Sequence, residues 1–139
     1  MWRSGVARRR DRDVLARMVA EAGRAQMYSA PWRLMPEVLD SYRSEHAVLR
    51  ELNRQWWSAL AGAVYVAIEA GDGDLVADVS RAYHEIHERH HALRRILEAH
   101  ADHPAIAAAM AKEQRLLRGA LGGRLRPGSA SVTPLDSAA

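Results

Sequence analysis

The chain has 139 residues, 48% of them hydrophobic, with a formal net charge of +3 and no cysteine. This length suits one domain, and the lack of cysteine excludes disulfides, thiol catalysis and thiolate metal sites. No apolar stretch of a signal peptide follows the basic start, and the longest apolar run, residues 56–68, is too short to span a bilayer. We therefore expect a cytoplasmic protein without a membrane span. The abundance of Ala, Leu, Arg and Glu predicts an all-α fold.

Positive charge is concentrated at the two ends of the chain. Residues 1–13 carry a net charge of +3 and residues 112–126 carry +4, whereas residues 14–111 carry −3. We expect residues 1–10 to form a disordered basic arm and residues 123–139 a disordered tail, because both are polar and poor in large apolar side chains. Arginines at these ends can neutralise the phosphates of nucleic acid, although no recognised DNA- or RNA-binding motif accompanies them. The candidate residues for this contact are Arg8, Arg9, Arg10, Arg12, Arg124 and Arg126.

Four helices are predicted between the ends, within one domain that covers residues 11–122. The first helix, residues 11–28, has a thin apolar face. The second begins near Pro36, because proline is favourable in a first helical turn, and its apolar residues keep three-four spacing up to residue 70, which gives a helix over 36–70. From Trp56 onward this helix is apolar nearly all round, which predicts burial on several sides.

Residues 71–74, with the sequence Gly-Asp-Gly-Asp, separate the second helix from the third, residues 75–101. Gly71 stands where a left-handed C-cap is favoured, and Asp74 is a suitable N-cap. So short a connection between two long helices predicts an antiparallel αα-hairpin. A fourth helix is expected at residues 104–121. The predicted fold is thus a helical bundle of three to four helices built on this long antiparallel hairpin, with disordered basic termini.

Two stripes run along helix 75–101. One is an apolar seam with gaps of four and three residues, which is expected to face the second helix: Val79, Tyr83, Ile86, His90, Leu93, Leu97 and His100. The other contains His84, His87 and His91, which lie within roughly 60° of one another on a helix. Two imidazoles at positions i and i+4 can chelate a divalent metal, with the third as an added ligand. The alternatives are histidines tolerated on a polar flank and a contact that responds to pH.

The register of the hairpin predicts further neighbours for the seam histidines. Positions whose numbers sum to roughly 145 should face each other in the antiparallel arrangement. This places His90 near Trp56 and Gln55, and His100 near Glu45 and His46. We expect a structural hydrogen bond at the second of these places rather than a catalytic dyad.

Trp56 and Trp57 point about 100° apart on their helix, so they face different neighbours. In one interpretation Trp57 packs against the first or fourth helix. In the other, Trp57, Val64 and Ile68 form an exposed patch that binds a second copy or another subunit, since tryptophan is favoured at interfaces. The predicted interface residues are Trp56, Trp57, Val64 and Ile68.

Signatures of enzymes are otherwise missing from the sequence. It has neither a glycine-rich phosphate loop nor a calcium-binding loop, and no motif carries a family resemblance. We therefore predict a non-catalytic helical interaction or assembly subunit, either self-associating or docking into a larger complex. No small-molecule substrate is inferred, and no cofactor apart from a divalent metal at the histidine stripe. The alternatives are a nucleic-acid-associated accessory protein and a metal-binding helical protein.

Overall fold

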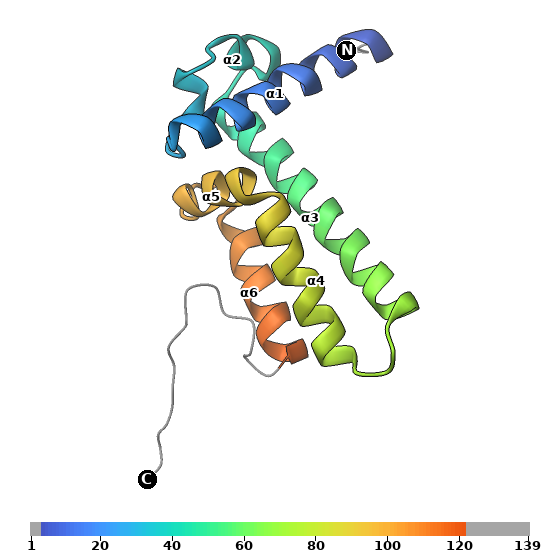
Figure 1. Ribbon diagram of the computed structural model, residues 1–139. Helices are drawn as coiled ribbons and strands as arrows, with labels where there is room; N and C mark the ends of the chain where they lie inside the picture. Colours follow the sequence, from blue (N-terminus) through green and yellow to red (C-terminus); the bar gives the residue numbers. More distant parts are fainter. Residues whose placement is uncertain (1–3, 122–139) are drawn as a thin grey trace. The chain divides into compact units, whose positions relative to one another are not determined.

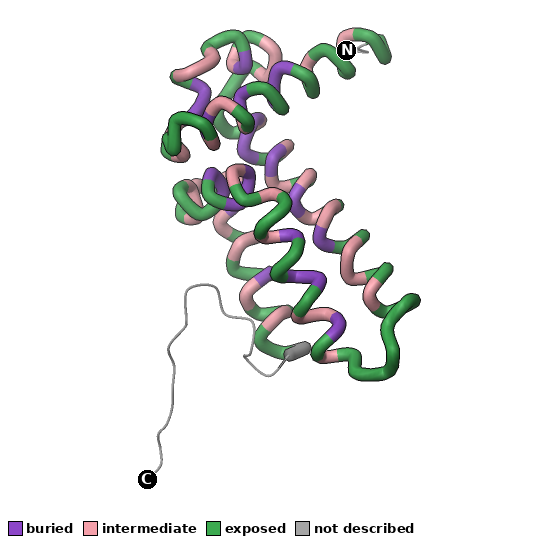
Figure 2. Tube along the Cα trace, in the orientation of Figure 1, coloured by how far each residue is buried: buried purple, intermediate pink, exposed green. Residues whose placement is uncertain are grey.

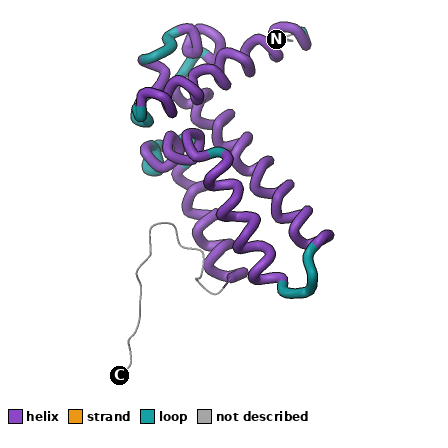
Figure 3. The backbone as a smooth tube through the Cα atoms, in the orientation of Figure 1, coloured by secondary structure: helices purple, strands orange, loops and turns teal. Residues whose placement is uncertain are grey.

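The computed structural model describes residues 4–121, with side chains described through Gly119. All regular elements in this part of the chain are helical, which confirms the predicted all-α class (Figures 1 and 3). The chain divides into two compact units, Met1–Ala107 and Ala108–Ala139. Helix α6 (Ala107–Leu121) forms the described part of the second unit. The tail predicted at residues 123–139 lies outside the described residues.

Helix α1 (Gly5–Ala25) begins earlier than the sequence predicted. The Oγ atom of Ser4 accepts a hydrogen bond from the backbone N–H of Ala7 at 3.1 Å, which caps the helix six residues ahead of the expected start. Residues 5–10 are therefore helical, and the prediction of a disordered arm is wrong for them. Alanine and arginine are good helix formers, so a cap at Ser4 is enough to extend the helix through this basic segment.

The predicted helix over 36–70 is interrupted. A short 3₁₀ helix, η1 (Pro31–Arg33), is followed by α2 (Glu37–Tyr42) and then by the long α3 (Glu45–Ala70). Arg43 separates α2 from α3 with a left-handed φ of 78°. Ser44 then restarts the helix, because its Oγ atom accepts a hydrogen bond from the N–H of Ala47 at 3.1 Å.

Helices α3 and α4 (Leu75–Arg89) form the predicted hairpin and make the most extensive contact between elements (Figure 1). As predicted, Asp74 caps α4, with its carboxylate accepting from the N–H of Ala77 at 3.1 Å. The prediction of a left-handed Gly71 is wrong, since its φ is −73°. Glycine is required there for space: a Cβ atom would collide with the Asp78 carboxylate and would lie 2.6 Å from the Ala67 carbonyl oxygen.

The predicted helix over 75–101 is also two helices. Helix α4 ends at Arg89, His90 has φ −113° and ψ 41°, and α5 (His91–Ala99) then contacts both α1 and α3. A Cβ atom at Gly23 of α1 would lie 3.2 Å from the Cβ atom of Ala92, so Gly23 permits the close approach of α1 and α5. This break turns the last part of the predicted helix towards α1.

The change in direction alters the surroundings of His100. Its Nε2 atom accepts from the N–H of Ala30 at 3.1 Å, and its Nδ1 atom lies 2.7 Å from the Ile96 carbonyl oxygen. The ring centroid is 5.2 Å from that of Trp32. The partners expected for His100, Glu45 and His46, are therefore wrong, because the prediction assumed one straight helix. His100 instead bonds to the backbone of Ala30 and of Ile96.

The core of the first unit lies where α1, α3 and α5 meet (Figure 2). Trp56 occupies it with no exposed surface. The ring centroid of Trp56 is 5.1 Å from that of His87 and 4.8 Å from the guanidinium carbon of Arg94. The buried apolar residues of these three helices are Val14, Leu15, Met18 and Ala22, then Val48, Leu49, Leu52, Trp56 and Leu60, and then Leu93, Ile96 and Leu97.

Candidate interaction surface

The second half of α3 differs in burial from the first. All the buried residues of α3 lie between Val48 and Leu60. The distal segment, which we define as residues 61–70, has none, although its sequence, AGAVYVAIEA, is almost entirely apolar (Figure 2). The prediction that this end of the helix is buried on several sides is wrong. Long apolar side chains are therefore presented to solvent by a helix whose other half is anchored in the core.

Large exposed hydrophobic side chains gather at this end of the hairpin. Tyr65, Val66 and Ile68 are 65%, 61% and 54% exposed, and Leu75, across the connecting loop, is 55% exposed. These four are the majority of the seven large hydrophobic residues that are exposed in the described part of the chain. Several exposed apolar residues at one end of a hairpin are typical of a binding site, whereas single exposed apolar residues are normal.

The four interface residues predicted from the sequence have different environments. Ile68 is exposed, and Trp57 and Val64 are half-buried. Trp56 is a correction: it lies wholly in the core, so it is unavailable to a partner. Tyr65, Val66 and Leu75 were missed as exposed residues, although the nearly uniform apolar character of residues 61–70 is a signal that pointed to Tyr65 and Val66.

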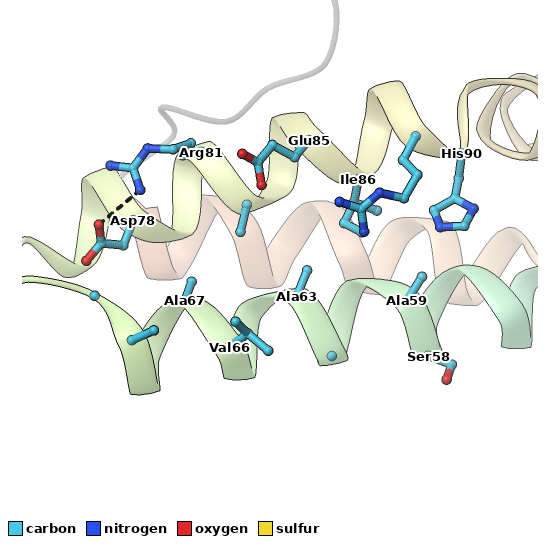
Figure 4. Close-up of a pocket in the computed structure, with 15 residues that line it drawn as sticks. Ser58, Ala59, Ala63, Val66, Ala67, Asp78, Arg81, Glu85, Ile86 and His90 are labelled. Carbon is cyan, nitrogen blue, oxygen red and sulfur yellow. Dashed lines mark hydrogen bonds and ion pairs between the residues drawn. The ribbon is translucent and has the colours of Figure 1, made fainter.

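A groove runs between α3 and α4 along the distal segment, with a volume of about 630 Å³ (Figure 4). Its α3 side consists of small or apolar residues, among them Ala59, Ala63, Val66 and Ala67. Its α4 side carries four charged residues, which we name the charged row: Asp78, Arg81, Glu85 and Arg89.

The charged row is only partly neutralised within the chain. Asp78 is buried, and its Oδ1 atom accepts from Arg81 Nη1 at 3.2 Å (Figure 4). The Arg81 side chain remains 63% exposed, so the pair is weak. Within residues 4–121, Glu85 and Arg89 form no hydrogen bond or ion pair through their side chains, and both are exposed. An apolar groove wall therefore faces a rim on which charges are available to a partner.

The three histidines proposed as metal ligands are not grouped in the structure. His84 is exposed on α4, and His91 is exposed on α5, with its ring 6.3 Å from that of Tyr28. His87 instead packs against the rings of Trp56 and Tyr83. The ring centroids of His87 and Tyr83 are 4.4 Å apart. Within residues 4–121, no three His, Cys, Asp or Glu side chains lie together as metal ligands. The break at His90 accounts for this, because it places His87 and His91 on different helices.

The imidazole of His87 has an unusual electrostatic environment. Burial lowers its pKa from 6.5 to about 4, and the positive charge of Arg94 adds to this effect, while Glu98 opposes it. Its Nε2 atom is buried and has no hydrogen-bond partner among the described residues. The histidine is therefore neutral at physiological pH and acts as an aromatic packing group.

The arginines of the N-terminal segment lie on the exposed surface of α1. Arg8 and Arg12 line a second depression, of about 470 Å³, together with Arg43 and Arg54. Arg54 donates two hydrogen bonds to Glu51, at 2.9 and 2.6 Å, which lowers the pKa of that carboxyl group. Arg9 and Arg10 are exposed nearby in the sequence, and Arg124 and Arg126 lie outside the described residues.

A comparison with protein-family models, with curated proteins and with solved structures finds no match to the chain. Of the helices within residues 4–121, none combines the length and apolar character needed to cross a membrane.

Proposed function

We propose that the protein is a non-catalytic helical assembly subunit, which associates through the distal segment of the α3–α4 hairpin. The observation that carries this proposal is the contrast within α3. Residues 45–60 supply five buried core residues, and the distal segment has none despite its apolar sequence.

The energetics of exposure support an interaction role. Removing a large apolar side chain from water contributes roughly 1.5–3 kcal/mol. A partner that covers Tyr65, Val66, Ile68 and Leu75, which are 54–65% exposed, gains a little more than half of this contribution at each, roughly 4–7 kcal/mol in all, against an association cost of about 4–15 kcal/mol. Because Leu52 and Trp56 anchor the same helix in the core, these side chains are held on a rigid element before the partner arrives. Little ordering cost is then added on binding.

Sedimentation of a matched pair of variants tests the proposal. Val66→Glu/Ile68→Glu places two charges on the surface, and both positions are more than half exposed, so the fold should survive. The control, Val6→Glu/Leu116→Glu, changes two apolar residues that are 62% and 51% exposed on other helices. We expect the wild type and the control to sediment as a larger species, either when purified or in an extract of the source cells, and the first variant to sediment as a single chain.

Two results would contradict the proposal. One is a wild-type protein that sediments as a single chain both when purified and in the extract. The other is an assembly that forms equally well with Val66→Glu/Ile68→Glu.

Contact with nucleic acid is a second candidate function, favoured by the depression near the start of α1. Four arginines line it against two acids, Asp11 and Glu51, so its charge is positive. Binding of a DNA or RNA duplex should then weaken steeply with salt and should fall on substitution of Arg8 and Arg12 by alanine. Binding that is absent at low salt, or is unaffected by the substitution, would exclude this function.

A further inference from the structure

The charged row has an order that makes it complementary to itself. Its signs along α4 are negative at Asp78, positive at Arg81, negative at Glu85 and positive at Arg89. With about 100° of rotation per residue, these positions lie within roughly 80° of one another on the helix. All four line the same side of the groove. Because the sign of the charge alternates along the row, the electrostatic energy of pairing it with an identical row depends on whether the two rows are parallel or antiparallel.

We propose that a second copy of the chain occupies the groove side of the hairpin, with its α4 antiparallel to α4 of the first and a two-fold axis near residues 83–84. This inference rests on the proposed function and identifies the partner. In this register, positions whose numbers sum to about 167 are opposite each other. Arg81 then faces Glu85 of the second copy, and the two-fold axis repeats this pair, so two exposed pairs of opposite charge form. Arg89 lies opposite Asp78 of the second copy, which is buried within its own chain and adds no exposed pair.

The alternative direction does not match. In a parallel pair with a two-fold axis along the helices, each residue meets its own equivalent, and the exposed residues Arg81, Glu85 and Arg89 give three pairs of like charge. An isologous interface between identical chains requires a surface that complements itself, whereas an unrelated partner places no such demand. The self-complementary order is therefore the observation that favours a second copy.

The α3 wall of the groove is lined by small side chains, which allow the second copy to come close enough for the two α4 helices to pair. Helices pack at separations of about 8–10 Å, and the shorter separations require small side chains at the contact. Ala59, Gly62, Ala63 and Ala67 supply such a wall, and Val66 supplies an exposed apolar group beside it. Burial of this wall stabilises the dimer, and the charged row selects its direction and register, as charges at the flanks of coiled coils do.

Charge reversal tests the register. In Arg81→Glu, both exposed pairs become repulsive because of the two-fold axis, and Glu85→Arg changes the same two pairs. Each reversal should raise the dimer Kd by roughly 10- to 30-fold at low salt. The double variant Arg81→Glu/Glu85→Arg restores both pairs with exchanged signs, so its Kd should return to within about 3-fold of the wild type. Mixing the two single variants should also restore a dimer, now between unlike chains.

Sedimentation equilibrium at low salt provides the measurement, with circular dichroism of each variant to show that the helices are retained. Arg50→Glu is the matched control, an exposed arginine on the first half of α3 and outside the groove. Wild type and control should both reach twice the chain mass of 15.5 kDa. Folded single variants that dimerise like the wild type would overturn the inference, and so would a double variant that stays as weak as the single ones.

The outcome also separates this inference from the proposed function. In one outcome the purified wild type is a monomer, but in the cell extract it belongs to a larger species that is lost in Val66→Glu/Ile68→Glu. This result would overturn the second copy as the partner, and the proposed assembly role would remain. A wild type that sediments as a single chain both when purified and in the extract would contradict the inference and the proposed function.

Discussion

Substitution of His87 by leucine should reduce the loss of stability that the protein undergoes in mild acid. The imidazole is held among the rings of Trp56 and Tyr83, and burial lowers its pKa to about 4, with Arg94 as a second cause. In the unfolded chain its pKa is about 6.5. As the pH falls below the unfolded value, the unfolded state takes up a proton that the folded state refuses, so the free energy of unfolding falls until the folded pKa is reached.

The size of this effect follows from the difference between the two pKa values. At about 1.36 kcal/mol per unit, the fall from 6.5 to about 4 corresponds to about 3 kcal/mol. The ring is only half-buried, and solvent screening reduces the expected loss to roughly 1–2 kcal/mol. Most of it should occur between about pH 7 and pH 5, which is above the range in which Glu51, whose pKa is lowered from 4.5, gains a proton.

Urea unfolding at several pH values measures this loss directly. His87→Leu retains an apolar side chain of similar size beside Trp56 and should lose about 1–2 kcal/mol less than the wild type over this range. His84→Leu, which removes an exposed imidazole from the same helix, should keep most of the wild-type loss. Equal losses in wild type and His87→Leu would refute the reasoning.

Four further substitutions test the fold. Gly71→Ala should cost about 1–3 kcal/mol of unfolding free energy, because its methyl group collides with the Asp78 carboxylate. Ser44→Ala removes the cap of α3 and should cost about 1 kcal/mol. Trp56→Ala should cost about 3–5 kcal/mol, because the ring is wholly buried, while the same change at half-buried Trp57 should cost no more than about 2 kcal/mol. Denaturant unfolding measures all four.

The chain offers matched controls for two of these. A Cβ atom at Gly62 meets no other atom within 4 Å, so Gly62→Ala should stabilise the helix by roughly 0.5–1 kcal/mol. Ser58 is exposed within α3, and Ser58→Ala should change stability by less than about 0.5 kcal/mol. A Gly71→Ala protein as stable as Gly62→Ala, or equal costs for Trp56 and Trp57, would show that the packing described for this hairpin is wrong.

The hairpin could be predicted because its determinants are local. A cap at Asp74, a four-residue connection and apolar seams on both sides agree with one another, and α3 and α4 form as these features require. Most of the seam is buried as predicted: Tyr83, Ile86, Leu93 and Leu97. Periodicity, capping and turn chemistry all act within a few residues, and so they are readable in the sequence.

The breaks in the long helices could be read only in part. Ser44 followed by Glu45 is an N-cap signal, but the apolar spacing continues across it and favoured one helix over 36–70. No proline or glycine marks the interruption at His90. We attribute the bend to the tertiary contacts of α5 with α1 and α3, which local sequence signals do not reveal. The periodicity of an interrupted helix can remain in phase, so spacing alone does not locate such a bend.

The candidate site was predicted in location but not in its details. The sequence pointed to residues 57–68, and exposed apolar groups do gather there. It could not decide which of Trp56 and Trp57 is buried, since adjacent helical positions differ only by rotation. The groove and its charged row depend on the side of α3 against which α4 lies, which is a tertiary property.

Labelling of exposed side chains by hydroxyl radicals tests the assembly role of the distal segment most directly. Tyr65 is 65% exposed in the single chain, and Met27, at 39%, is an internal reference away from the segment. We predict that labelling of Tyr65 falls relative to Met27 as the purified protein is concentrated, or when it is labelled in an extract of the source cells. An unchanged ratio in both settings would mean that nothing covers the side of the distal segment on which Tyr65 lies, and would contradict the proposed role.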